Sequence, residues 1–228
     1  MASTYTPLGV ELMATGENAG TWGTKTNANL NLIEQLTGGF ATLSIAGGAG
    51  SQALDVDNGA LTGTAQQRII EFTGSITGNR IITIPNDVET FYILKNSTSG
   101  AYTVQFKYLT GSGSSTTFSA TDKGIKTVYA SANDGTNPDI VDVMANSSEI
   151  AVTNSNPIKF QDADNSAFVG IDAPATVSGS YTLTLPAGVG SASQALVTTD
   201  GAGTLGFTST SSFGITTGKA IAMAIVFG

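Results

Sequence analysis

The sequence predicts a mainly β chain with one short helix close to its N-terminus. Only 11% of the 228 residues are charged, 40% are hydrophobic, and Gly, Ser and Thr are abundant. This composition suits an extended β architecture better than disorder. Short apolar stretches recur about every ten residues between clusters of Gly, Asn, Asp and Ser, as strands do in β-sandwiches. One segment, between Ala14 and Gly39, has a helical pattern instead.

The N-terminal region, residues 1–39, is expected to form a strand, a loop and a helix. A short strand over residues 8–13 leads into a loop rich in Gly. Thr24 or Thr26 is placed to cap a helix of about three turns that ends near Leu36. The region would form a compact element that precedes the β-rich part of the chain.

The helix has an apolar stripe that must rest on something, because isolated helices of this length are marginal in water. The stripe contains Ala28, Leu32, Ile33 and Leu36, with Leu30 on its flank. Gly38 and Gly39 are a typical helix stop, because Gly accepts the left-handed conformation after the last turn. The stripe can pack on its own domain or on a partner chain, and Trp22, a favoured interface anchor, keeps the second option open. The Asn-rich opposite face suits hydrogen bonding to a neighbour's backbone.

Residues 40–145 are expected to form an antiparallel β-sandwich or jelly roll, because short strands separated by turns follow one another closely. The expected strands are residues 41–45, 54–56, 68–72, 80–84, 91–95, 102–108, 116–120, 125–130 and 139–144. The stretch 91–95 is apolar on both faces, which places it at the centre of a sheet. The inward positions are apolar enough to build a core.

Residues 146–156 are polar and are interpreted as a linker to a third part, residues 157–228. This part has short strands, many Gly turns and few large side chains, too few for a core in one copy. Because the chain has no Cys to staple it, three copies wound together are expected to supply the core. The segment Ala220 to Phe227 is apolar on both faces, which suits either a buried strand in the trimer or a tail that docks into a neighbouring protein.

The composition excludes several classes of function. His and Cys are absent, which excludes Ser-His-Asp and Cys-His catalysis, disulfides and the usual zinc sites. A net charge of −8 with nine scattered Lys and Arg residues gives no electrostatic footprint for nucleic acid. No secretory signal is expected, and the longest apolar run is far below the ~20 residues that span a bilayer. The chain is therefore expected to have no cofactor, metal, nucleic-acid partner or membrane insertion.

Some residues match the first part of a known motif without completing it. Gly201, Gly203 and Gly206 have dinucleotide-binding spacing, but they do not open a helix. Acidic residues also occur in pairs that could bind Ca²⁺ in a turn, or act as the two carboxylates of a glycoside hydrolase. The turn pairs are Asp55 with Asp57 and Asp162 with Asp164, and the other pairs are Glu71 with Glu89 and Asp139 with Asp142. Ordinary turns and solvated strand ends are the favoured interpretation.

The loop and helix resemble the N-terminal segment of a family of bacteriophage virion proteins, the tail-fibre or structural proteins frequent in phages of marine bacteria. The family pattern is G-x-x-x-G-T-W-G followed by an Asn-rich helix that ends in Ile-Glu. The matching residues are Gly16, Gly20, Thr21, Trp22, Gly23, Asn27, Asn29, Leu30, Ile33 and Glu34. The resemblance implies attachment to the particle, through the expected contact residues Thr21, Trp22, Gly23, Asn27, Leu30, Leu32, Ile33 and Leu36.

The C-terminal part resembles a module that recurs in trimeric phage fibres. Its pattern is F-V-G-x-x-A-P-A-T-V, then Y-T-L-x-L-P, then Q-x-L-x-T-D-G-x-G-x-L, matched here between Phe168 and Leu205. The resemblance implies a homotrimeric β-rich shaft. Its expected interface residues are Phe160, Phe168, Val169, Tyr181, Leu183, Leu185, Leu196, Ile221, Met223 and Ile225.

The expected protein is a non-enzymatic phage virion component, a homotrimeric tail fibre that is attached through its N-terminus and serves host attachment. The alternative is a head (capsid) fibre or a decoration or cement protein. A receptor-degrading depolymerase is a third, less favoured hypothesis. The expected partners are two further copies of the chain, another virion protein of the tail, baseplate or head, and a host surface receptor. The protein would be assembled in the bacterial cytoplasm and located in the virion.

Overall fold

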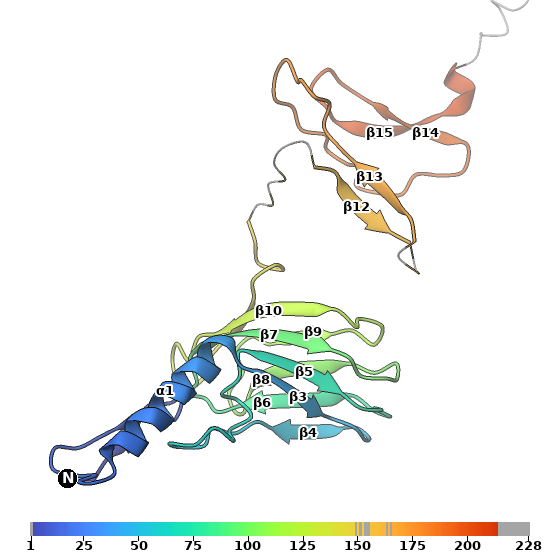
Figure 1. The fold of residues 1–228 in the computed structure, drawn as a ribbon. Helices are drawn as coiled ribbons and strands as arrows, with labels where there is room; N and C mark the ends of the chain where they lie inside the picture. The colour runs from blue at the N-terminus through green and yellow to red at the C-terminus, as the bar shows by residue number, and fades with distance from the viewer. Residues whose placement is uncertain are drawn as a thin grey trace, which may run out of the picture. The chain divides into compact units, whose positions relative to one another are not determined.

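In the computed structural model of this chain, the described residues are 2–148, 150, 152, 156–162, 164 and 166–213. The chain divides into two units, Met1–Ile150 and Ala151–Gly228, and the boundary between them falls within the polar stretch 146–156. The expected mainly β architecture with a short helix near the N-terminus is confirmed in the described residues (Figure 1). Each unit is described by itself below.

The first unit begins with a small hairpin and a helix. Strands β1 (Thr4–Tyr5) and β2 (Glu11–Leu12) pair antiparallel and lead into α1 (Trp22–Gly38). The helix has 17 residues, so it begins earlier and runs longer than predicted. Neither Thr24 nor Thr26 caps it, because both lie inside the helix, and the N-cap residue is Thr21.

The end of α1 differs from the expected left-handed glycine stop. Gly39 has φ −64° and ψ 143°, which is extended backbone, and its N–H donates to the Gln35 carbonyl oxygen at 2.7 Å. A Cβ atom on Gly39 would lie 2.4 Å from that same oxygen. The position requires glycine because there is no room for a side chain, and the chain turns directly into the first long strand.

Two sheets form the rest of the first unit. The five-stranded sheet has the order β11-β10-β7-β5-β3, and the four-stranded sheet has the order β4-β6-β8-β9. The strands are β3 (Phe40–Ser44), β4 (Gly50–Ala53), β5 (Ile69–Thr73), β6 (Arg80–Ile84), β7 (Thr90–Asn96), β8 (Val104–Tyr108), β9 (Thr116–Phe118), β10 (Ile125–Ala130) and β11 (Ile140–Asp142). Strand β7, apolar on both faces in the sequence, lies at the centre of the larger sheet as expected.

The direction of the strands corrects the sequence prediction. From β3 to β8, successive strands alternate between the two sheets, so the chain winds through three coils: coil 1 (β3 and β4), coil 2 (β5 and β6) and coil 3 (β7 and β8). Equivalent strands of neighbouring coils pair in parallel. Within these two sheets, the pairs that involve β9, β10 and β11 are the antiparallel ones among the described strands, and they lie at the far end of the stack. The expected antiparallel sandwich is therefore wrong for the three coils.

The coils are stacked in a regular register. Ile69 pairs with Ile93, Ser75 bridges to Ser99 and Arg80 pairs with Val104, so coils 2 and 3 are offset by 24 residues all the way round. Coil 1 is longer by the loop that follows β4. The side chain of Gln66 in this loop is buried, and its Nε2 donates to the Leu8 carbonyl oxygen at 2.8 Å. This bond fastens the N-terminal region to coil 1.

The core of the first unit lies between the two sheets and is rich in aromatic rings. Phe106 of β8 packs edge-on against Tyr92 of β7, with ring centroids 5.4 Å apart, and lies 6.4 Å from Phe72 of β5. All three side chains are completely buried. The Tyr92 hydroxyl donates to the Ala65 carbonyl oxygen at 2.7 Å, so this core contains a satisfied polar group. The first unit therefore has a closed core of its own.

The second unit consists of two hairpins with long connections. Strand β12 (Ile158–Gln161) pairs antiparallel with β13 (Phe168–Ile171), and β14 (Gln194–Thr198) pairs antiparallel with β15 (Leu205–Ser209), which precedes the 3₁₀ turn η1 (Thr210–Phe213). No side chain is buried among those of this unit that the structure describes. The predicted C-terminal strand, with Ile221, Met223 and Ile225, lies outside the described residues.

Candidate interaction surfaces

The helix α1 is held against the N-terminal hairpin by polar contacts centred on Glu11. Lys25 Nζ lies 2.9 Å from Glu11 Oε2, and the Glu11 side chain is only 4% exposed. The Asn29 amide makes two bonds to the Glu11 backbone: its Oδ1 accepts from the Glu11 N–H, and its Nδ2 donates to the Glu11 carbonyl oxygen, both at 2.9 Å. Asn29, one of the residues that match the virion-protein pattern, therefore binds the backbone of the hairpin that precedes the helix.

The Glu11–Lys25 contact also shifts the ionisation of both groups. The Lys25 ammonium group, which hydrogen-bonds to Glu11, holds the pKa of that carboxyl below its usual value of 4.5. The Glu11 carboxylate in turn raises the pKa of Lys25 above its usual 10.5. Both groups are therefore charged over a wide pH range, which keeps the hairpin and helix together.

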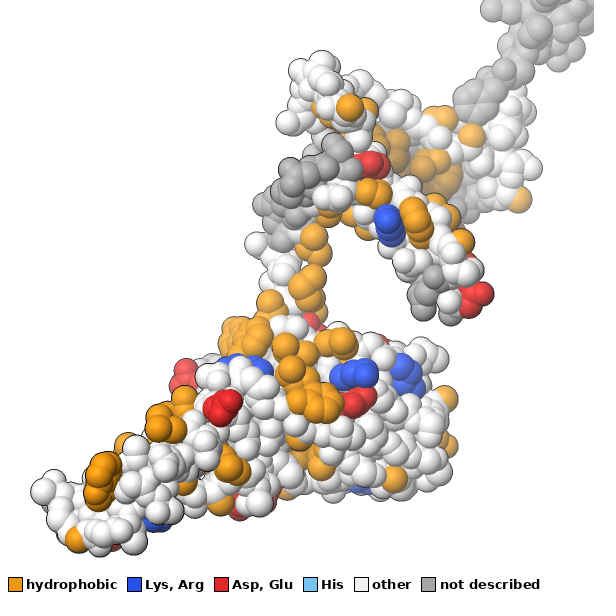
Figure 2. Space-filling model, viewed as in Figure 1, with side chains coloured by type: hydrophobic (Ala, Val, Ile, Leu, Met, Phe, Trp, Pro, Cys, Tyr) orange, Lys and Arg blue, Asp and Glu red, His pale blue; other side chains and the backbone are white. Residues whose placement is uncertain are grey.

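The expected apolar stripe of α1 divides into a packed part and an open part. Leu32 is buried and Leu36 half-buried, so these two residues face the protein. Trp22, Leu30 and Ile33 are 66%, 58% and 47% exposed. At 3.6 residues per turn these three side chains fall within about 80° of one another. Figure 2 shows hydrophobic side chains in a row along α1. We call Trp22, Leu30 and Ile33 the open helix face.

The other expected attachment residues lie around the open helix face without joining it. Thr21 Oγ1 donates to the Asn18 carbonyl oxygen at 3.2 Å and makes no side-chain cap bond to the helix. Gly23 is half-buried, and Asn27 is exposed. Three of the eight expected residues thus lie on one exposed apolar face. Two others, Leu32 and Leu36, face the protein.

A second set of exposed apolar side chains lies on the outer face of the five-stranded sheet, which also carries the Glu71–Lys95 ion pair, and this set was not predicted. It comprises Phe40 of β3, Phe91 of β7, and Ile125 and Tyr129 of β10, which are 39–64% exposed. Strand pairing brings Phe91 opposite Tyr129, and the Arg68 guanidinium lies 5.9 Å from the centre of the Phe91 ring. The alternation of these strands could have indicated this outer face, because apolar residues also occupy the positions that do not point into the core.

The expected trimer-interface residues of the second unit are all exposed in a single copy. The described ones are Phe160, Phe168, Val169, Tyr181, Leu183, Leu185 and Leu196, with exposed fractions between 49% and 74%. Register places Phe160 opposite Val169 on the β12–β13 hairpin, while Lys159 Nζ lies 4.3 Å from the centre of the Phe168 ring. So much exposed apolar surface on a short β segment marks an interaction site.

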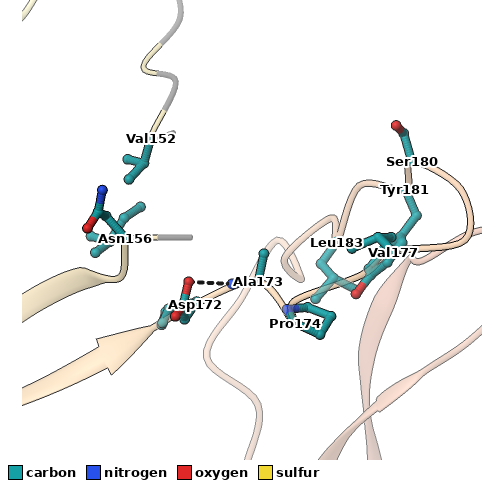
Figure 3. A pocket seen from close by; sticks show the side chains of 11 residues that line it. Val152, Asn156, Asp172, Ala173, Pro174, Val177, Ser180, Tyr181 and Leu183 are labelled. Carbon is teal, nitrogen blue, oxygen red and sulfur yellow. Dashed lines mark hydrogen bonds between the residues drawn. The ribbon is translucent and has the colours of Figure 1, made fainter. Parts of the chain in front are cut away.

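The same unit contains a hollow of about 510 Å³ (Figure 3). Its lining is mainly apolar and includes Ile158, Ile171, Val177, Tyr181 and Leu183. Near its rim the Asp172 carboxylate accepts a bond from the Ala173 N–H at 2.8 Å. The hollow overlaps the expected trimer interface at Tyr181 and Leu183.

The acidic motifs of the sequence serve local structure. Asp55 Oδ1 accepts bonds from both the backbone and the hydroxyl of Thr64, and Asp57 Oδ2 accepts one from the Thr62 hydroxyl. Among the described residues no group of three or more acidic side chains is arranged to hold a metal ion. An EF-hand that began at Asp55 would need a Glu at position 66 to complete its Ca²⁺ site. The residue there is Gln66, whose buried side chain binds the Leu8 carbonyl oxygen instead.

Three of the four carboxylates considered for catalysis, those of Glu71, Asp139 and Asp142, bind partners in neighbouring strands or loops. Glu71 Oε1 lies 2.8 Å from Lys95 Nζ, and Asp142 Oδ2 lies 2.9 Å from Lys126 Nζ. Asp139 Oδ1 accepts a bond from the Ser114 N–H at 2.7 Å. These contacts tie neighbouring strands and loops together.

No helix in the part of the chain that the structure describes is long and apolar enough to cross a membrane. Comparisons of the chain with protein-family models, with curated proteins and with solved structures found no match. The exposed apolar surfaces of the two units are the features that bear on function.

Proposed function

We propose that this chain is a non-enzymatic structural protein of a bacteriophage particle, a homotrimeric fibre attached through its N-terminal region and serving host attachment. The observation that carries the proposal is the distribution of apolar side chains. The first unit has a closed core, yet α1 presents Trp22, Leu30 and Ile33 to solvent. The described part of the second unit presents almost all of its large apolar side chains to solvent. Both surfaces need partners, and the resemblance of the two segments to phage proteins suggests which.

The homotrimer is supported by the second unit. A β segment without buried side chains gains too little from folding alone, and the absence of Cys excludes covalent staples. Burial of each large apolar side chain between copies would contribute about 1.5–3 kcal/mol. The copies would thus supply to one another the core that a single chain lacks, and the N-terminal units would remain free to dock on the particle.

Trp22→Ala tests the attachment role, with Leu32→Ala as the matched control on the same helix. Trp22 is 66% exposed and Leu32 is 1% exposed. We expect Trp22→Ala to leave the melting temperature within about 2 °C of wild type, because exposed substitutions change stability by about 0.5 kcal/mol or less. Purified particles should carry much less of this variant, as measured by quantitative mass spectrometry. Leu32→Ala should instead lower the melting temperature by several degrees, since it leaves a cavity.

Two results would contradict the attachment role of Trp22. One is normal incorporation of the Trp22→Ala variant into particles. The other is a fall in its melting temperature comparable to that of Leu32→Ala, which would show that Trp22 fills a local core.

A further inference from the structure

The outer margin of coil 1 is an open strand edge. Among the described strands, β3 and β4 are the end strands of their sheets, and each pairs on one side only. The Ile69 N–H donates to the Gly39 carbonyl oxygen and the Ile45 N–H to Thr73, so odd-numbered residues of β3 face β5. In a parallel ladder the intervening residues then point their N–H and C=O groups the other way. Thr42 and Ser44 present these groups to the open side.

This edge lacks the devices that usually protect a strand from pairing with another chain. Natural edges carry charges, Pro or bulges, or are covered by another element. Residues 40–54 contain no charged residue and no Pro. The covered strands of the next coils do carry charge: Glu71 and Lys95 stand in register with Thr42, and Arg80 with Gly50. Of the strands in the three coils, those at the open margin, β3 and β4, are thus the ones without charged residues.

The corners of the coils give an independent sign that the stack is incomplete. Gly100, Ile76 and Gly47 occupy equivalent corners of coils 3, 2 and 1, as the bridge of Gly47 to Ile76 and the 24-residue offset indicate. A Cβ atom on Gly100 would lie 2.2 Å from the Ile76 carbonyl oxygen of the preceding coil. A Cβ atom on Gly47 would meet nothing within 4 Å. Coil 1 therefore has space for another strand where the other coils have a neighbour.

A strand that fits this edge must be apolar on both faces. On one face it would continue the core beside Leu43, and on the other it would continue the outer surface beside Phe40. The chain contains such a sequence beyond the described residues: positions 220–227, AIAMAIVF, are uncharged and wholly apolar. Eight residues in a strand extend about 26 Å, more than the length of β3.

We propose that the C-terminal segment, residues 219–227, of a neighbouring copy pairs with the open edge of β3. A head-to-tail contact of this kind either closes into a ring or continues as a filament. In the trimer proposed above, three segments meet three edges and the ring closes. That three copies take part rests on the proposed function. That the C-terminal segment of another copy occupies the edge of β3 does not rest on it. The trimer would then be locked by exchanged strands as well as by the second units.

The first test is the substitution Thr42→Pro, with Thr42→Ala as the matched control. Pro removes the N–H that faces the open side, and it breaks no hydrogen bond to β5. Pro is also tolerated on edge strands. Hydrogen exchange is measured on the full chain. In wild type and in Thr42→Ala, we expect the amides at positions 42 and 44 to be protected from exchange by the added strand. In Thr42→Pro, the Ser44 amide should exchange at least about tenfold faster than it does in the other two proteins. Unchanged exchange of the β7 amides in Thr42→Pro would confirm that its coils stay folded.

The second test uses disulfide trapping, which is clean because the chain has no Cys. Ser44→Cys is combined in turn with Ala220→Cys, Ala222→Cys or Ala224→Cys, because the register of the added strand is to be found by scanning. We expect one pairing to give covalent multimers under oxidation. The same partners combined with Thr117→Cys, on the margin strand β9, should give none.

Three outcomes would overturn the inference. They are fast exchange of Thr42 and Ser44 in wild type, the absence of any Ser44 cross-link, and cross-links confined within single chains. A trimeric mass measured in the same samples would leave the proposed function standing in each case, so the two failures are distinguishable.

Discussion

Single residues at the coil corners decide whether the stack closes tightly. Gly100 has φ +99°, a conformation that side chains rarely adopt, and its Cα faces the carbonyl oxygen of Ile76. Gly47 has φ +119° at the equivalent corner but borders open space. The two glycines share a conformational requirement and differ in the space around them. They therefore form a natural pair for separating backbone strain from steric contact.

We expect Gly100→Ala to destabilise the first unit more than Gly47→Ala. The positive φ costs each variant about 1–3 kcal/mol. Gly100→Ala must also move the coil 2 backbone, because its Cβ would lie 2.2 Å from the Ile76 oxygen. Thermal unfolding followed by circular dichroism would show the difference as an additional fall of several degrees. Equal melting temperatures for the two variants would mean that the corners do not pack as described.

The N-terminal hairpin and α1 form one element because Glu11 links them. Its carboxylate binds Lys25, and its backbone pairs with the Asn29 amide. The pKa of Glu11 is lowered, so the contribution of the pair is fully present above about pH 4.5 and is lost as the pH falls through the lowered value. The pKa of Lys25 is raised, so the same contribution is lost again as the pH rises beyond about 10.5.

We expect the environment of α1 to change when the pH falls below 4.5, before the coils unfold. The indole N–H resonance of Trp22, the only Trp of the chain, is a direct reporter in NMR spectra. The Glu11→Gln variant should lack this transition, because it removes the titrating carboxyl and keeps a side chain of similar shape. A transition of Trp22 that persists unchanged in Glu11→Gln would assign the pH dependence to another group.

At the scale of the whole molecule, the two units differ in where their apolar side chains lie. The first unit packs Phe72, Tyr92 and Phe106 inside its own coils. The described part of the second unit leaves its apolar side chains open to solvent in one copy. Association stabilises a folded state in proportion to the logarithm of partner concentration, so only a unit that folds with its partners should respond to dilution.

We therefore expect two unfolding transitions in calorimetry. The transition of the first unit should keep its midpoint over a hundredfold dilution, and that of the second unit should move to lower temperature. The substitution Leu183→Asp should lower only the concentration-dependent transition, while Leu109→Asp, at an exposed position of the first unit, serves as the control. A single transition that is independent of concentration would contradict the division of roles between the units.

The sequence predicted where most strands lie but not how they pair. Arg80–Ile84 and Ile125–Ala130 were predicted with the observed bounds, because alternation of apolar and polar residues marks a half-buried strand wherever it occurs. Alternation is the same for parallel and antiparallel partners. The 24-residue offset between coils 2 and 3 could have revealed the winding, but equivalent positions carry dissimilar residues, such as Glu71 and Lys95, or Arg80 and Val104.

The candidate surfaces were predicted in part. Helical spacing identified the apolar positions of α1, yet which of them stay open depends on where the hairpin clamps the helix through Glu11 and Asn29. That contact joins residues 18 positions apart, so no periodic pattern in the sequence indicates it. The open edge of β3 was missed for a related reason. An edge is defined by a missing neighbour, and only the topology shows that no other described strand lies beyond β3.

Because the coils stack by translation, the length of the first unit is set by the number of its coils. Each coil adds one strand to each sheet, and neighbouring strands are about 4.8 Å apart. The element that fastens the helix lies at one end, at coil 1, and the antiparallel closure β9–β11 lies at the other. Duplicating one 24-residue coil would therefore lengthen the unit by about 4.8 Å without redesigning either end. Length in such a protein can change in fixed steps, by gain or loss of a single coil.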